Sequence, residues 1–101
     1  MVDFVCKENY GLEDYIALIS YLRSEKGSSS DGVQTHESLR RSLLEEAYEV
    51  CEAIDEGDSS HLREELGDLL LQVIFHASIE QDAGSFDMDG IADAACKKLV
   101  F

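Results

Sequence analysis

The spacing of the apolar residues constrains this chain most strongly. They recur at the period of an amphipathic helix, and no segment of strand length alternates between apolar and polar residues. The chain also contains no proline, the residue that most strongly breaks a helix. The spacing therefore predicts an all-α protein with helices over about residues 12–25, 35–56, 58–83 and 87–99 and a flexible loop over residues 26–34. We expect a four-helix bundle-like fold that is completed by oligomerisation.

Residues that favour helix ends lie at the borders of these segments. Thr35, Asp58 and Asp87 are placed to cap the second, third and fourth helices, because their side-chain oxygens can accept hydrogen bonds from free backbone N–H groups. Gly57 and Gly84 are placed to end the second and third helices, since glycine readily adopts the left-handed conformation found there.

The charge of the chain excludes several classes of partner. Its 101 residues, which we expect to form a single domain over 1–101, include 22 Asp and Glu against 8 Lys and Arg, a net charge of −14. Nucleic acids and anionic membranes are bound by clustered Lys and Arg, so neither is expected as a partner. The most hydrophobic stretch, residues 66–77, contains Asp68 and Gln72 and is too short to cross a bilayer.

The three cysteines, Cys6, Cys51 and Cys96, do not form the pattern of a disulfide framework or a zinc site. They are odd in number, far apart, and without a CxxC pair. Residues 1–11 mix charged and apolar side chains and lack the continuous apolar core of a signal peptide. We therefore expect a cytoplasmic protein with reduced thiols.

The second expected helix carries acidic residues that do not all lie on its solvent face. On a helical wheel the apolar residues gather on one side, and this expected buried face consists of Leu39, Leu43, Ala47, Val50, Cys51 and Ile54. Glu45, Glu52 and Glu56 lie opposite and are interpreted as surface residues. Glu46 lies at the border of the buried face, with Glu49 on its shoulder. An unpaired carboxylate at such a border is costly.

The third expected helix is apolar around most of its circumference, which is typical of the central helix of a bundle. One narrow polar strip interrupts it, made of Glu65, Asp68, Gln72 and His76. Gly67 lies beside this polar strip, at a cost of about 1 kcal/mol relative to Ala in a helix interior. Close helix packing is the favoured interpretation of Gly67, and room for a ligand is the alternative. His76 either supports a ligand-binding residue or is a core histidine with satisfied hydrogen bonds.

Two expected helices thus each present carboxylates three positions apart toward a shared interior: Glu46 with Glu49, and Glu65 with Asp68. Two unit charges 4 Å apart repel by about 4 kcal/mol at an effective dielectric constant of 20, so convergent carboxylates need a cation. All-oxygen ligation suits Mg²⁺, or Mn²⁺, better than zinc. The pattern favours a divalent metal site, and pairing of the carboxylates with Arg63 and Arg40 is the alternative.

Three motifs carry a family resemblance: QTHESL at residues 34–39, LEEAYE at 44–49 and REELGDLL at 63–70. Together they resemble the MazG nucleoside triphosphate pyrophosphohydrolase family, whose signature is EExxE followed after a spacer by ExxD. The similarity extends from about residue 22 to residue 99. It implies an all-α enzyme that hydrolyses a nucleoside triphosphate to the monophosphate and pyrophosphate with Mg²⁺.

The resemblance also implies roles for individual residues. The positions that hold the metal in the family correspond to Glu46, Glu49, Glu65 and Asp68. A water would attack the α-phosphorus in line, and Glu49 is our candidate to orient and deprotonate it. The candidate substrate-binding residues are His36, Arg40, Lys97 and Lys98. For His36 and Arg40 this interpretation comes from their position in the sequence, and an ordinary solvated surface role is the alternative.

Two departures from the family pattern bear on the activity of this chain. The family's Cys-Pro-Trp-Asp before the first motif is Ser28-Ser29-Ser30-Asp31 here, so an aromatic that could stack on a base is missing. The family's basic Arg-Arg-His-Pro segment after the last helix is also missing, which leaves Lys97 and Lys98 as the nearest substitutes for phosphate contacts.

Self-association and the class of function complete the expectations. Four short helices bury little surface on their own, so a homodimer or homotetramer is expected, with Tyr48 as a candidate contact residue. The functional alternatives are a non-catalytic acidic helical module that binds a protein, and a pyrophosphatase of narrower specificity for dUTP, dCTP or phosphoribosyl-ATP.

Overall fold

The structure is a computed structural model, and it describes residues 6–24 and 33–101. Its elements are four helices, α1 (Leu12–Arg23), α3 (Arg40–Glu56), α4 (Ser59–Asp82) and α5 (Met88–Val100), with no strand in either described range. The all-α prediction is therefore confirmed.

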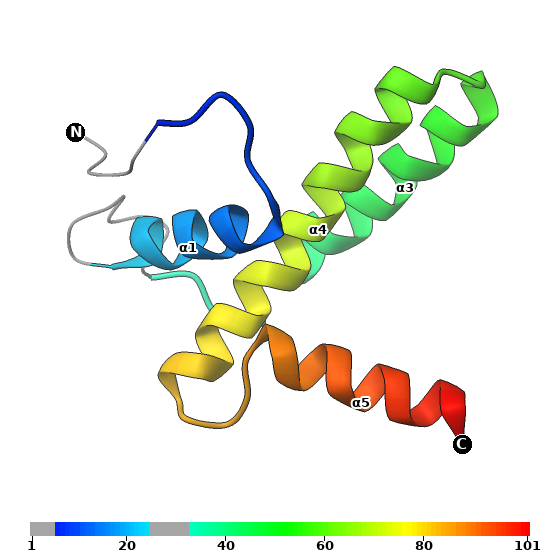
Figure 1. Ribbon diagram of the computed structural model, residues 1–101. Helices are drawn as coiled ribbons and strands as arrows, with labels where there is room; N and C mark the ends of the chain where they lie inside the picture. Colours follow the sequence, from blue (N-terminus) through cyan, green and yellow to red (C-terminus); the bar gives the residue numbers. More distant parts are fainter. Residues whose placement is uncertain (1–5, 25–32) are drawn as a thin grey trace.

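The longest helix, α4, organises the molecule. α3 lies along the first part of α4, α1 packs against its middle, and α5 leaves its far end and diverges from the other helices (Figure 1). The other helices contact α4 and not one another within the part of the chain that the structure describes. The prediction of a central third helix is confirmed.

Most of the predicted helix ends are confirmed. The carboxylate of Asp58 accepts hydrogen bonds at the start of α4, and that of Asp87 accepts one from the N–H of Gly90 at the start of α5. Gly57 and Gly84 have φ values of 71° and 78°, so both adopt the left-handed conformation that ends a helix. The turn at Gly57 and Asp58 joins α3 and α4 into a helical hairpin.

The predicted start of the second helix at Thr35 is wrong. Residues 36–39 form turns, and α3 begins at Arg40 after Leu39. Thr35 and Ser38 bond each other reciprocally, because each side-chain oxygen accepts from the other residue's N–H. Leu39 is buried in the core, and this tertiary contact shapes the segment before α3. The predicted loop residues 26–32 lie outside the described residues.

A small apolar core lies where α1 and the turn before α3 meet α4. Its buried members are Ile19, Leu39, Ile74 and Phe75. Partly buried side chains of α1 and α4 surround them, joined by Met88 of α5. No helix in the described ranges is both long and apolar enough to cross a membrane.

The predicted buried face of α3 is largely wrong. Of its six residues only Leu39 and Val50 are buried, and Ala53 is buried in place of the others. The exposed apolar residues of α3, called here the α3 apolar face, are Leu43, Leu44, Ala47, Tyr48, Cys51 and Ile54. Among the described residues α4 is the one helix that packs against α3, so only one side of α3 is covered. Most of the residues on which the helical wheel centred the buried face lie on the uncovered side.

Candidate metal centre

The helical hairpin of α3 and α4 brings three predicted metal ligands together. Glu46 projects from α3, and Glu65 and Asp68 project from α4. One carboxylate oxygen of each residue lies within 4.8 Å of the other two. We call this group the acid cluster. Because the two-residue connection fixes how α3 lies along α4, it also fixes which carboxylates face each other.

Burial makes the acid cluster electrostatically costly. Glu65 is only 8% exposed, and burial is the main cause that raises its pKa to about 7. Burial likewise raises the pKa of the half-buried Glu46, and the negative charge of Asp68 adds to this effect. In both residues the neighbouring carboxylates shift the pKa further in the same direction, so the ionised forms of Glu46 and Glu65 are disfavoured by the like charges around them.

The residues of the acid cluster fit a hard divalent cation. One Oε2 atom, that of Glu46, is buried without a hydrogen-bond partner in the described residues. Such an orphaned oxygen is costly unless a ligand satisfies it. The donors are all carboxylate oxygens, which Mg²⁺ and Mn²⁺ prefer.

The fourth predicted metal ligand, Glu49, lies beside the acid cluster rather than in it. Its side chain is exposed. A hydrogen bond between the carboxyl groups of Glu49 and Glu65 contributes to the raised pKa of Glu65. The structure therefore places the exposed Glu49 next to the buried Glu65.

The alternative of arginine pairing finds no support. Arg40 and Arg63 are both exposed, and in residues 6–24 and 33–101 no ion pair joins either of them to the acid cluster. The predicted phosphate ligands Lys97 and Lys98 lie in the exposed last turn of α5, and Lys97 pairs with Asp93 at 2.9 Å. The described contacts do not bring these bases to the acid cluster.

His36 contacts the far end of the polar strip. Its Nδ1 lies 2.7 Å from Nδ1 of His76, with the two rings stacked at 4.9 Å between centroids, and its Nε2 contacts Glu80. If the Nε2–H of His36 donates to the carboxylate, its Nδ1 accepts from His76. Nε2 of His76 is then an acceptor, and it is buried without a partner among the described residues. Burial lowers the pKa of His76, which favours this neutral form.

The polar strip contains a second buried acceptor without a hydrogen-bond partner among the described residues. Gln72, 8% exposed, has a buried Oε1 without a hydrogen-bond partner in the described part of the chain. Gln72 lies one turn from His76, so two unsatisfied acceptors follow each other along α4. No role was assigned to Gln72 or Glu80 from sequence. A glutamine in an otherwise apolar helix was the available signal for the first, whereas Glu80 gave none.

Gly67 adjoins open space. A Cβ added there would meet no atom within 4 Å among the described residues, so the interpretation as close helix packing is wrong for this chain. The hydroxyl of Tyr15 donates a hydrogen bond of 2.8 Å to the carbonyl of Gly67. Burial and the nearby charge of Asp68 raise the pKa of Tyr15.

Comparison with known proteins agrees with these features. The MazG nucleotide pyrophosphohydrolase domain matches residues 34–101. The chain is 44% identical over 88 residues to the nucleoside triphosphate pyrophosphohydrolase/pyrophosphatase MazG of Thermotoga maritima. It is 51% identical over 90 residues to a nucleoside triphosphate pyrophosphohydrolase of Mycolicibacterium smegmatis, and 40% identical over 89 residues to one of Escherichia coli. Each alignment covers 87% of this chain but only 34%, 27% and 34% of the respective relatives.

Proposed function

This chain belongs to the MazG nucleotide pyrophosphohydrolase family, and on that premise we propose that it hydrolyses nucleoside triphosphates to the monophosphate and pyrophosphate with Mg²⁺ as the cofactor. The observation that carries the proposal is the acid cluster, in which two helices direct three carboxylates at one point with an orphaned Glu46 oxygen. A surface acidic face would instead keep its carboxylates apart and solvated.

The acid cluster would hold the metal through Glu46, Glu65 and Asp68, with Glu49 as a fourth ligand. A divalent ion held there would supply positive charge that offsets the negative charge developing on the leaving pyrophosphate. Mn²⁺ would serve as a substitute.

Glu49 is the proposed general base. Its exposed carboxylate beside Glu65 would accept a proton from the water that attacks the α-phosphorus. The new P–O bond forms as the bond from the α-phosphorus to the bridging oxygen breaks, and the electron pair leaves with pyrophosphate. Exposure supports this role because the attacking water must reach the carboxylate.

The polar strip would bind the remainder of the substrate. The buried, unsatisfied acceptors of Gln72 and His76 would suit hydrogen-bond donors such as sugar hydroxyls or base N–H groups. His36, the proposed substrate-binding residue beside them, would orient the His76 ring through its contact with Nδ1. Arg40, Lys97 and Lys98 remain the phosphate contacts proposed from sequence, and no described contact within the single chain brings Lys97 or Lys98 to the acid cluster. Narrower substrates, namely dUTP, dCTP and phosphoribosyl-ATP, belong to the same proposal.

A panel of NTPs and dNTPs with Mg²⁺, scored for pyrophosphate and monophosphate together, tests the activity. Glu65→Gln is expected to lower turnover at least 100-fold, while Glu64→Gln, at an exposed neighbouring position, leaves it intact. Release of orthophosphate in place of pyrophosphate would contradict the proposed bond cleavage.

A homodimer or homotetramer is proposed as the functional form. The α3 apolar face supports it, because Leu44, Tyr48 and Ile54 are 61%, 72% and 58% exposed in the single chain. The same face supports the alternative function, a non-catalytic module that binds a protein partner. We also propose a cytoplasmic location, supported by three free and exposed cysteines that a reducing compartment keeps reduced.

A further inference from the structure

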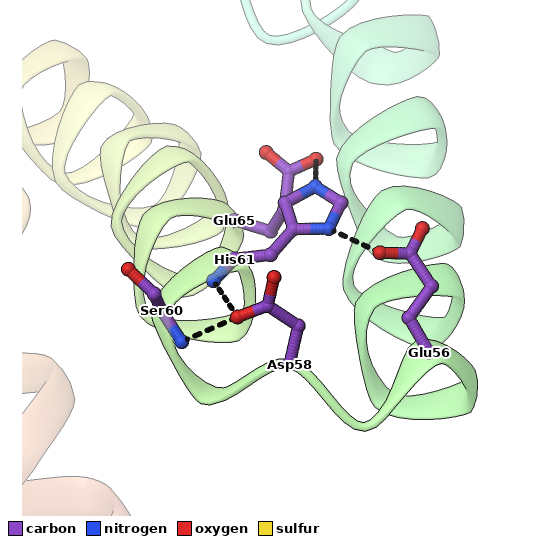
Figure 2. Close-up of polar contacts among 5 residues, drawn as sticks. All are labelled: Glu56, Asp58, Ser60, His61 and Glu65. Carbon is purple, nitrogen blue, oxygen red and sulfur yellow. Dashed lines mark hydrogen bonds and ion pairs between the residues drawn. The ribbon is translucent and has the colours of Figure 1, made fainter.

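His61 links the helical hairpin's turn to the acid cluster. It lies in the first turn of α4, between the last residue of α3, Glu56, and the cluster member Glu65 (Figure 2). Nδ1 of His61 is 2.9 Å from Oε2 of Glu56, and Nε2 is 3.6 Å from Oε2 of Glu65. Each ring nitrogen therefore faces one carboxylate.

The position of His61 is fixed from both ends. Its backbone N–H donates to the carboxylate of Asp58 at 3.2 Å, as does that of Ser60 at 3.0 Å. Its Nδ1–H donates to Glu56, the residue before the Gly57 turn. The main chain is thus held by the helix cap and the ring by the neighbouring helix, which leaves Nε2 directed at Glu65.

Glu65 is the carboxylate that most needs such a partner. It is the most buried member of the acid cluster, and Glu46, Glu49 and Asp68 all surround it with like charge. Within residues 6–24 and 33–101, His61 is the one basic side chain at ion-pair distance from the cluster. Without it, repulsion would favour rotation of the Glu65 carboxylate away from the shared point.

We infer that His61 is a positioning residue that holds the Glu65 carboxylate in the orientation in which it ligates the metal, while Glu56 orients the imidazole. This inference rests on the proposed function, because it takes the acid cluster as a metal site. Polar partners behind a metal ligand fix its orientation, and the loss of such a partner weakens metal binding 10–100-fold in typical sites. Here the partner contact is the ion pair of 3.6 Å between His61 and Glu65.

The test compares two amide replacements of His61 in the full chain. Glutamine places its amide nitrogen near the position of Nε2 and can still reach Glu65, whereas asparagine mimics Nδ1 and reaches only Glu56. Mn²⁺ affinity is measured from the loss of the free-ion EPR signal, without nucleotide. His61→Asn is expected to weaken Mn²⁺ binding by about 10–100-fold, and His61→Gln by several-fold less.

Controls separate positioning from folding. Ser60→Asn introduces the same amide one residue earlier and is expected to leave Mn²⁺ affinity unchanged. Glu56→Ala is expected to weaken it, and Glu52→Ala, an exposed acid on the same helix, is not. Thermal unfolding of the metal-free variants is measured in parallel, and a structural role would lower the melting temperature of His61→Asn and His61→Gln alike.

The outcomes are distinct from those of the proposed function. The inference is overturned if His61→Asn binds Mn²⁺ as tightly as wild type. It is also overturned if both His61 variants lose Mn²⁺ affinity equally and in proportion to the fall in their unfolding temperatures. Failure of the wild-type chain to bind Mn²⁺ overturns it as well. A chain that binds Mn²⁺ in a His61-dependent way but releases no pyrophosphate supports the inference and contradicts the proposed activity.

Discussion

At the scale of single residues, the acid cluster couples folding stability to pH. The pKa of Glu65 is raised from 4.5 to about 7, so the folded chain binds more protons than the unfolded chain between these values. Stability conferred by the protonated acid is therefore present at low pH and lost as the pH rises through about 7. We expect the metal-free protein to lose stability over this window, and Glu65→Gln to remove part of the loss.

Denaturant unfolding of wild type and Glu65→Gln from pH 5 to pH 8 measures this difference, with Glu64→Gln as the exposed control. Parallel pH profiles for wild type and Glu65→Gln would contradict a strongly shifted Glu65. Use of the difference between variants removes the contribution of His76 and the other titrating groups, which both proteins share.

Gly67 provides a second residue-scale prediction. Gly67→Ala is expected to raise the free energy of unfolding by about 0.5–1 kcal/mol, because alanine is the better helix former and its Cβ meets open space. Urea denaturation measures the gain. Gly90→Ala is the matched control in α5, since its Cβ would lie 3.2 Å from that of Phe86 and should yield a smaller gain.

The activity of Gly67→Ala tests whether a ligand occupies that space. A more stable variant with reduced nucleotide turnover supports close approach of the substrate beside Asp68. Full turnover in the same variant would show that the substrate leaves this side of α4 free.

At the scale of helices, the α3 apolar face predicts self-association. Leu44→Lys places a charge in this face, and we expect it to shift the protein toward the monomer because burial of an unpaired charge is costly. Sedimentation velocity measures the shift, and circular dichroism checks that helix content is kept. Glu52→Lys adds the same side chain outside the apolar face. If the two variants have the same mass in solution as wild type, the contact lies elsewhere.

The helices also show which features sequence can predict. Local backbone chemistry determines where several helices begin and end. The predicted N-caps Asp58 and Asp87 and the predicted terminating glycines Gly57 and Gly84 are all confirmed. The predicted start of α3 was wrong because the burial of Leu39 is a tertiary contact, which the local sequence does not reveal. The predicted buried face of α3 was largely wrong because a helical wheel shows where apolar residues gather. It does not show whether another helix covers them.

The candidate site divides in the same way. Glu46, Glu65 and Asp68 could be grouped from sequence because each lies beside the apolar residues of its helix, although Glu65 is buried, Glu46 is half-buried and Asp68 is exposed. The contact of His36 with His76 spans 40 positions. The periodicity within a helix cannot predict that a residue in the turn before α3 contacts α4. The contacts of His61 with Glu56 and Glu65 depend on the geometry of the turn between α3 and α4. A helical wheel describes one helix and does not include that turn.

At the scale of the whole molecule, the net charge of −14 makes divalent cations a general stabiliser, in addition to the specific binding proposed at the acid cluster. We expect MgCl₂ to raise the melting temperature more than NaCl of equal ionic strength, because specific binding stabilises the folded state by about 2.7 kcal/mol at 100 times the dissociation constant. Differential scanning calorimetry measures the difference. The triple variant Glu46→Gln, Glu65→Gln, Asp68→Asn should show a smaller difference between the two salts, which leaves only the general effect of divalent cations, and an undiminished preference for Mg²⁺ would place its site elsewhere.

The two-residue connection between α3 and α4 has a consequence for the order of assembly. All three members of the acid cluster lie on consecutive helices, so little chain entropy is lost when they meet. Short-range contacts of this kind form early in folding. Residues 40–82 thus hold all three carboxylates of the proposed metal site before either flanking helix docks, and on that proposal a cation encountered at that stage would act as a template for the rest of the chain.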